Sequence, residues 1–494
     1  MVETSGIATR QAQDRARLLA ALRTGRIRQQ ASTIPVVDRS QPLPVSLGQQ
    51  RLWFIDQITT DHSAYVIADC ALVRGELDLS ALRGALAFVF ARHETLRTVF
   101  DVVDGVPMQQ VLPAQGGESL LEVVDAGANE EKEILSDWLR RPFDLGTGPM
   151  LRAIVVRIGP DEAMVGVAVH HIATDGVSFG ILVDDLVGAY AELIRGGRPE
   201  PVPPAIGYAD FAAWQRDAVD GPALSGQLDY WADTLRKAPN GVDLPLDRPR
   251  PDVQSFAGGV HLISVPREVV AELKAFGAQR NLTLFVLLYT TFAALLRRWS
   301  GQHDIVIGTS LAGRGRVEFE SIFGFFINNV VLRMDLADDP TWSDALDRAR
   351  EVVLGAFDNQ DVPFETVVDK VAPGRDLSRN PLFQIMFVLQ NFAPRRLSLP
   401  GLDSTPVELS SQTSKFDLSM NWLELDDGGL LGVMEYDSAL FDQSTMDRLG
   451  SHYEQLLRTA VASADLPVSR LPLLDETETE EIVRRATGAQ VPIP

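Results

Sequence analysis

The sequence predicts an α/β (α+β) fold built from two lobes of similar architecture. Its 494 residues are 45% hydrophobic and 23% charged, which is enough chain and enough apolar surface for two domains or lobes. Short apolar, β-branched runs alternate with amphipathic helical patterns, and the coarse order of strands and helices in the first half recurs in the second. An irregular Pro-rich stretch at residues 243–259 separates the two patterns.

The predicted elements follow from local periodicity and from helix start signals. In the first half, we expect strands at 65–74, 150–159 and 163–171, and a helix at 79–94. In the second half, we expect strands at 261–266, 304–311 and 380–391, and helices at 267–280, at 341–360, at 444–463 and after Thr283, which can cap it.

The chain is divided accordingly into four parts. We predict an N-terminal helix and linker at 1–40, a first lobe at 41–225, a second lobe at 226–475 and a C-terminal linker at 476–494. The first part contains a short basic helix candidate at 14–28. The last residues have the composition of a linker that continues into something longer.

Composition argues against several classes of partner and cofactor. Lys plus Arg total 45 and Asp plus Glu total 67, and the resulting charge of −22 opposes binding to nucleic acid or to an anionic membrane. The one cysteine, Cys70, allows neither an intrachain disulfide nor a cysteine metal cluster. No stretch approaches the roughly eighteen apolar residues of a membrane helix, and no apolar signal core or nucleotide-binding glycine motif is present. We expect a cytoplasmic protein without a bound metal.

The strongest chemical signal is the stretch AVHHIATDGVSFG at residues 168–180. His170 and His171 end a buried-strand pattern, Asp175 follows in a tight Asp-Gly turn, and Ser178 can cap the next helix. Because neighbouring strand residues point to opposite faces, one histidine can face a cavity while the other packs into the protein. An imidazole titrates near neutral pH, so the motif indicates proton-transfer or hydrogen-bonding chemistry at a strand end.

HHxxxDG at a strand end resembles the active-site signature of chloramphenicol-acetyltransferase-like acyltransferases, which include the condensation domains of nonribosomal peptide synthetases. Other stretches match the motifs of condensation domains in their usual order: SLGQQRLWF (46–54), RHETLRTVF (92–100), YADFAAWQ (208–215), GFFINNVVLR (324–333), NQDVPFE (359–365) and RDLSRNPLFQIMFVLQN (375–391). The resemblance covers about residues 40–475. The sequence departs from the family pattern at Gly48, Val177, Asn329 and Asn359, where alanine, tryptophan, threonine and histidine are usual.

This resemblance implies a pseudo-dimer of two acetyltransferase-like lobes in a V, with an active-site tunnel at their junction. Donor and acceptor carrier proteins would deliver thioesters there on 4'-phosphopantetheine arms, and the product would be a peptide bond. The motifs are most similar to the subtype that joins an L-configured donor to an L-configured acceptor. The resemblance also implies a downstream adenylation domain and no bound cofactor. A monomer is expected because the pseudo-dimer buries its own interface.

Within this resemblance, His171 aligns with the catalytic histidine of the family. Aminolysis of a thioester needs a positioned amine and a managed proton, and it needs no covalent intermediate on the enzyme. His171 could therefore remove a proton from the amine, or it could position the amine through a hydrogen bond. His170 is expected to be structural, because strand alternation turns it to the other face.

Supporting roles are expected for residues around the histidines. The resemblance implies that Asp175 is structural and pairs with an arginine, for which Arg97 is the candidate. It also implies that Gly176 admits the substrate and that its amide stabilises an oxyanion. Ser310 is expected to line the tunnel, and Asn328 lies in a motif that resembles the bridging region between the lobes.

Other activities of the same fold stay open at this point. Epimerisation shares HHxxxDG, but the intact motifs at 359–365 and 375–391 favour condensation, and heterocyclisation is disfavoured because its DxxxxD motif is absent. The departures at Val177 and Asn329 suggest a variant that also modifies its substrate, for example by dehydration. A non-catalytic platform that recruits a tailoring enzyme would usually lose the histidines, and a stand-alone acyl-coenzyme-A transferase would not explain the terminal linker.

Overall fold

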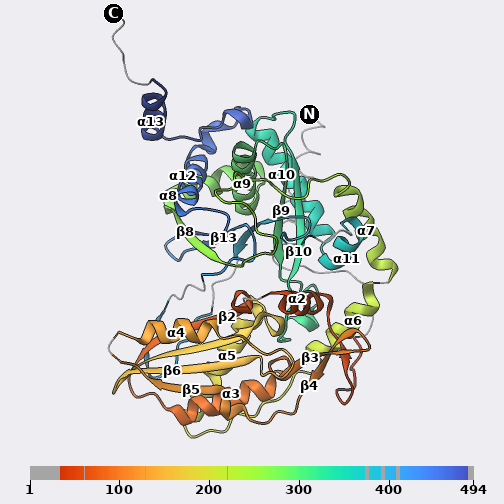
Figure 1. Ribbon diagram of the computed structural model, residues 1–494, viewed down its shortest axis with the longest axis vertical. Coiled ribbons are helices and arrows are strands. Elements are labelled where there is room, and N and C mark those ends of the chain that lie inside the picture. The colour runs from red at the N-terminus through yellow and green to blue at the C-terminus, as the bar shows by residue number, and fades with distance from the viewer. Residues whose placement is uncertain are drawn as a thin grey trace, which may run out of the picture.

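The computed structural model describes residues 34–487, apart from residues 60–61, 128, 220, 373–375, 377, 391–394 and 408–411. The chain forms two lobes, one above the other in Figure 1, and each contains a β-sheet covered by helices. This is the two-lobed α/β architecture that the sequence predicts. The helix candidate at 14–28 lies outside the described residues.

The first lobe contains a five-stranded sheet in the order β12-β2-β7-β6-β5 and a three-stranded sheet in the order β1-β4-β3. Its strands are β1 (Leu43–Pro44), β2 (Val66–Arg74), β3 (Thr98–Val103), β4 (Val106–Val111), β5 (Leu121–Asp125), β6 (Leu151–Gly159), β7 (Glu162–His170) and β12 (Asp403–Pro406). Its helices include α2 (Leu47–Ile58), α3 (Leu79–Arg92), α4 (Glu131–Arg140), α5 (Gly176–Ile194) and α6 (Tyr208–Val219).

Strand β7 is buried on both faces, because helices cover both faces of its sheet. Val165, Val167 and Val169 belong to the core formed with α3 and α5, whereas Met164 and Ala168 belong to the core formed with α4. Burial of one such aliphatic side chain contributes about 1.5–3 kcal/mol, so this alternation is strongly specified. It directs the last residue of the strand toward the α4 face and frees the next residue from the sheet.

The second lobe is built on a six-stranded sheet in the order β10-β9-β11-β13-β14-β8. Its strands are β8 (Gly258–Val265), β9 (Asp304–Leu311), β10 (Asn328–Asp335), β11 (Ile385–Gln390), β13 (Leu418–Glu424) and β14 (Leu430–Asp437). Its helices include α7 (Pro222–Thr234), α8 (Arg267–Arg280), α9 (Leu284–Ser300), α10 (Trp342–Asp358), α11 (Phe364–Val371) and α12 (Gln443–Thr459). Thr283 caps α9 as predicted, accepting the Val286 N–H at 3.3 Å.

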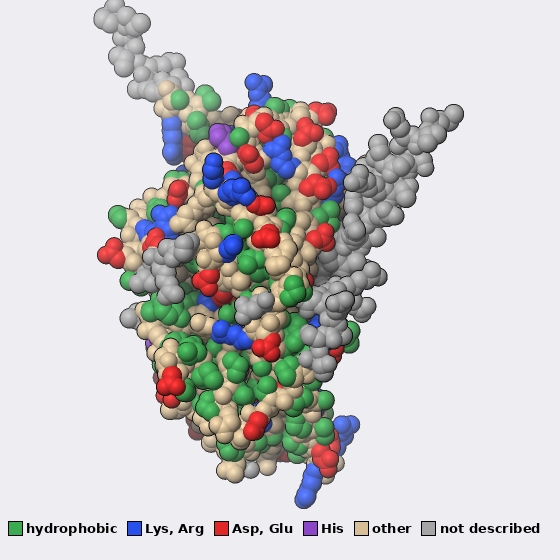
Figure 2. Space-filling view, turned by 90° about the vertical axis from the view of Figure 1, so that its right-hand side faces the viewer, with side chains coloured by type: hydrophobic (Ala, Val, Ile, Leu, Met, Phe, Trp, Pro, Cys, Tyr) green, Lys and Arg blue, Asp and Glu red, His purple; other side chains and the backbone are tan. Residues whose placement is uncertain are grey.

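Helix α9 is buried along nearly its whole length and forms the centre of the second core. Over the part of the chain that the structure describes, no single helix combines the length and hydropathy needed to cross a membrane; α8 and α9 meet both conditions only as a pair, which is bent by 104°. On the face seen in Figure 2, acidic and basic side chains are interspersed over the upper lobe, and hydrophobic side chains are more frequent over the lower one.

Two segments of the predicted second lobe pack in the first. Strand β12 pairs antiparallel with β2 and adds an edge strand to the first sheet, and Leu397 and Leu399 just before it are buried in that lobe's core. The loop after β9 contributes Phe319, Phe323 and Phe326 to the same core. The predicted division after residue 225 does not describe these segments, because no local pattern records which distant sheet edge a crossing strand will cover.

The predicted C-terminal linker is helical over α13 (Glu476–Thr487). Asp475 accepts the Glu478 N–H at 2.7 Å at the start of this helix, and the Glu478 carboxylate contacts Nε2 of His452 at 2.8 Å. Acidic residues in the first turn and arginines in the last turn also favour a helix, because they complement its dipole.

Candidate active site

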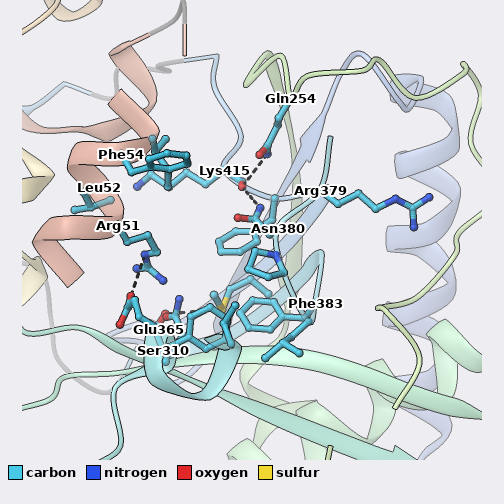
Figure 3. A pocket seen from close by; sticks show the side chains of 18 of the residues that line it. Arg51, Leu52, Phe54, Gln254, Ser310, Glu365, Arg379, Asn380, Phe383 and Lys415 are labelled. Atoms are coloured by element: carbon cyan, nitrogen blue, oxygen red, sulfur yellow. Dashed lines mark hydrogen bonds and ion pairs between the residues drawn. The ribbon is translucent and has the colours of Figure 1, made fainter. Parts of the chain in front are cut away.

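A cavity of about 810 Å³ lies between the two lobes. The first lobe contributes part of α2, Tyr65 just before β2, and His171. The second lobe contributes residues of α11 and of its sheet, including Ser310 and Phe383. Figure 3 shows Arg51 of α2 on one side of this space and Phe383 on the other. The junction of the lobes therefore holds the chamber that the sequence predicts.

His171 is the first residue after β7 and opens the short 3₁₀ turn η4 (His171–Ala173). Its Nδ1 lies 2.8 Å from the Thr174 carbonyl oxygen. A carbonyl only accepts hydrogen bonds, so Nδ1 carries the proton and Nε2 keeps a lone pair. Burial lowers the pKa of His171 well below its ordinary value, and the Lys415 ammonium adds to this effect. The ring, packed edge-on against Phe325 at 5.2 Å, is a neutral base in the cavity wall.

His170 lies on the opposite face of β7, as strand alternation predicts. It is 2% exposed, its Nδ1 accepts the Ile172 N–H at 3.1 Å, and its ring packs edge-on against Phe143 at 6.0 Å. Burial is the main reason that the pKa of His170 is lowered to about 3. Because protonation of Nδ1 would also remove the acceptor for the Ile172 N–H, this histidine is held neutral inside the first lobe.

The neutral state of His170 is expected to make the domain lose stability on mild acidification. As the pH falls below about 6.5, the unfolded chain binds a proton at this residue and the folded chain does not, so the free energy of unfolding decreases by about 1.4 kcal/mol per pH unit. The loss reaches about 3 kcal/mol at pH 4. Chemical unfolding of the wild type and of His170→Asn, which keeps an acceptor near Nδ1, measures it. Identical pH slopes for the two proteins between pH 6.5 and 4 would contradict the prediction.

Asp175 connects the start of α5 to the second lobe's loop. One carboxylate oxygen accepts the Ser178 N–H at 2.7 Å as the helix cap, and the other accepts the Phe326 N–H at 2.9 Å. The Arg314 guanidinium lies 3.3 Å from the first oxygen. Ser178 is not the cap: α5 begins two residues earlier, and its hydroxyl instead contacts the Gly324 backbone and Arg314. The carboxylate is 2% exposed, so this cluster is a buried interlobe joint.

The partner of Asp175 is therefore Arg314, and the prediction of Arg97 is wrong. The Arg97 guanidinium donates to the Leu112 carbonyl at the end of β4 and lines a second cavity, on the side of Arg39. The physical reason is direction: Arg97 ends a 3₁₀ turn that leads into β3 and so faces β4, whereas the loop after β9 crosses the lobe junction and carries its arginine to the start of α5.

The remaining predicted residues are split between the cavity and its framework. Ser310 lines the cavity and donates to Oδ1 of Asn329, another lining residue, at 2.8 Å. Asn328 donates to two carbonyls of the loop before α11, each at 2.8 Å, so it braces the second lobe internally and does not bridge the lobes. Gly176 and Val177 open α5 and are absent from the described residues that line the cavity.

Sequence reasoning missed two charged residues of the cavity wall, Lys415 and Glu435. A signal for the second was available: in β14, Met434 and Tyr436 are buried in the core, so the intervening Glu435 points to the opposite face. Lys415 lies in the irregular segment before β13, where no periodicity predicts a direction. Within the described residues, no group of three or more His, Cys, Asp or Glu side chains is placed to hold a metal ion.

The fold and the site together define a class of protein: a two-lobed acyltransferase fold with a neutral histidine in the chamber between its lobes. Residues 39–483 match the family model for the condensation domain, and the chain belongs to this family. It is 38% identical, over 481 residues and 96% of its length, to a linear gramicidin synthase of Brevibacillus parabrevis. It spans 6% of that relative's length.

Solved structures show the same fold. The X-domain in its complex with OxyB from teicoplanin biosynthesis superposes with a TM-score of 0.83 at 27% identity, covering 91% of this chain and 99% of that one. The first condensation domain of the calcium-dependent antibiotic synthetase, in complex with a substrate analogue, has a TM-score of 0.72 at 19% identity, covering 88% of this chain and 100% of that one. The predicted pseudo-dimeric chloramphenicol-acetyltransferase-like fold is confirmed.

Proposed function

We propose that this domain forms a peptide bond between a donor peptidyl or aminoacyl thioester and the α-amine of an acceptor aminoacyl thioester. Membership of the condensation-domain family supports acyl transfer to an amine. One observation carries the proposal: the Thr174 carbonyl holds the proton of His171 on Nδ1, which leaves the Nε2 lone pair in the chamber between the lobes. A histidine in this state can accept a proton from an attacking amine.

The proposed reaction is balanced by His171 alone. The acceptor amine attacks the thioester carbonyl carbon, the C–N bond forms, and the electron pair of the C=O bond moves to oxygen. Nε2 then takes one proton from the nitrogen. When the oxyanion collapses, the C–S bond breaks, and the departing thiolate receives that proton from the imidazolium. A buried site keeps the imidazole neutral at the start, and no covalent enzyme intermediate is required.

The proposed partners are two carrier proteins, and the proposed substrates are their acylated 4'-phosphopantetheine arms. The cavity volume of about 810 Å³ is within the usual range for small-molecule sites, so two modest acyl groups can meet in it. The large synthase that the chain resembles supports a place within a longer assembly, with an adenylation domain downstream. The proposed reaction uses no bound cofactor.

The test uses two carrier proteins that bear different L-aminoacyl thioesters. The domain is added, and both carriers are followed by intact-protein mass spectrometry. Movement of the donor acyl mass onto the acceptor supports the proposal, and its absence over several L-amino acid pairs contradicts it. A mass loss of one water on either carrier would indicate instead the variant that modifies its substrate.

A non-catalytic recruitment platform is the second candidate, and a specific similarity favours it. The X-domain superposes with a TM-score of 0.83, and in that structure it forms a complex with OxyB. If this domain transfers no acyl group but forms a stable complex with a tailoring enzyme, this candidate replaces the first. The intact, correctly protonated His171 in the cavity supports the catalytic candidate.

A further inference from the structure

We propose that Lys415 is a second catalytic residue, whose ammonium donates a hydrogen bond to the oxyanion formed when the amine attacks the thioester. This inference rests on the proposed function and assigns a new role within the same cavity. Lys415 belongs to the second lobe and His171 to the first, and both side chains line the chamber between them. The reacting carbonyl would therefore lie between a base on one wall and a cation on the other.

The position of Lys415 is fixed at its backbone. Its carbonyl oxygen accepts hydrogen bonds from Nε2 of Gln254 at 2.9 Å and from Nδ2 of Asn380 at 2.8 Å, which hold the segment before β13 (Figure 3). The side chain extends toward the first lobe, where Nζ lies 5.4 Å from the centroid of the Tyr65 ring. The same ring is 6.4 Å from the ring of His171, so one aromatic side chain contacts both groups.

The Lys415 ammonium has donors to spare. Over the part of the chain that the structure describes, no hydrogen bond or ion pair reaches Nζ; its near neighbour is the face of the Tyr65 ring. A lysine ammonium has three N–H donors, and burying them unpaired is costly. That cost is recovered when a negative oxygen forms beside the cation. A buried donor that gains its partner only in the transition state is what oxyanion stabilisation requires.

Glu435 supplies the charge that keeps Lys415 protonated. Burial lowers the pKa of Lys415, and Glu435 opposes this shift, while burial raises the pKa of Glu435. Glu435 faces the cavity from β14, directly opposite Ser419 of β13. The other charged side chains on the wall are Arg51, Glu365, Asp369, Asp376 and Arg379. Arg51 is paired with Glu365 at 3.3 Å and Arg379 with Asp243 at 3.2 Å, which sets these two arginines apart from Lys415.

The step leaves Lys415 chemically unchanged. The C–N bond forms as the C=O electron pair moves to oxygen, and the Lys415 N–H donates to that oxyanion without transferring its proton. The carbonyl re-forms as the C–S bond breaks, and the proton taken up by His171 leaves with the thiolate. The amide of Gly176, which the sequence suggested for this role, belongs to a residue outside the described cavity lining.

The test compares Lys415→Met and Lys415→Arg with the wild type in single-turnover transfer between the two loaded carriers. We expect Lys415→Met to be about 100-fold slower, as when one oxyanion donor is removed, and Lys415→Arg to recover part of the rate because it keeps a charged donor. The affinity for the donor carrier and the melting temperature should not change. Lys274→Met is the matched control, since Lys274 forms a surface ion pair with Glu424.

A pH profile separates a charge effect from a structural one. In Glu435→Gln the pKa of Lys415 loses its support and falls, so the rate should begin to decline at lower pH on the alkaline side than in the wild type. An alkaline limb that does not move would overturn the role of the ammonium. A folded Lys415→Met variant that transfers within threefold of the wild type would overturn the proposal while leaving peptide-bond formation intact. A wild type that transfers nothing would overturn both.

Discussion

Replacing His171 by alanine is expected to slow acyl transfer between carriers by roughly 10²–10⁴-fold, the usual contribution of general acid–base catalysis. The variant should stay folded, because the ring lies in a cavity wall and the bond it makes, to the Thr174 carbonyl, is at a turn. Intact-mass kinetics of donor and acceptor measure the rate. His261→Ala is the control: this imidazole contacts Asp447 at 2.8 Å on the second lobe, away from the cavity lining.

The pH dependence of the same rate follows from the burial of His171. Its pKa lies well below the ordinary 6.5, so the neutral base persists from neutral into weakly acidic solution. The acid limb of the rate profile should therefore lie well below pH 6.5. A limb centred at pH 6.5 that disappears in His171→Ala would show a solvated histidine and contradict the buried geometry.

Breaking the joint between the lobes is expected to have the largest effect on stability. In Arg314→Met the Asp175 carboxylate stays buried without its counter-charge, and removing one partner of a buried ion pair typically costs about 3–5 kcal/mol. The guanidinium also bonds to Ser178 at 2.6 Å and packs over the Phe326 ring at 4.1 Å. Chemical denaturation measures the free energy of unfolding. A loss below about 1 kcal/mol, the usual value for an exposed pair, would contradict the prediction.

A double-mutant cycle separates the correct arginine from the predicted one. Asp175→Asn and Arg314→Met should be coupled, because the double variant has no unpaired charge left to penalise. Asp175→Asn and Arg97→Met should add within about 0.5 kcal/mol, since these residues share no partner. Asp137→Asn, which removes an exposed pair with Arg140, is the surface control and should cost less than about 1 kcal/mol.

Much of the fold follows from periods that are local in the chain. The alternation through β7 separates His170 from His171 correctly, because burial on two helix-covered faces demands it. The start of α9 at Thr283 is predicted because a cap needs only the next few residues. Where two caps compete, local reasoning is less exact: Asp175 precedes Ser178, and an aspartate caps equally well, so α5 begins earlier than expected.

The sequence by itself determined the two-lobed α/β class, the strand that ends in the histidines and, through its motifs, the family. Only the tertiary structure decided which distant groups meet: Arg314 at Asp175, 139 residues apart, β12 at β2, and Lys415 beside Tyr65 and His171. The physical reason is that periodicity and capping act over a few residues, whereas an ion pair or a cavity wall depends on how whole lobes pack. That packing is set by the summed burial of both cores, which no single stretch of sequence contains.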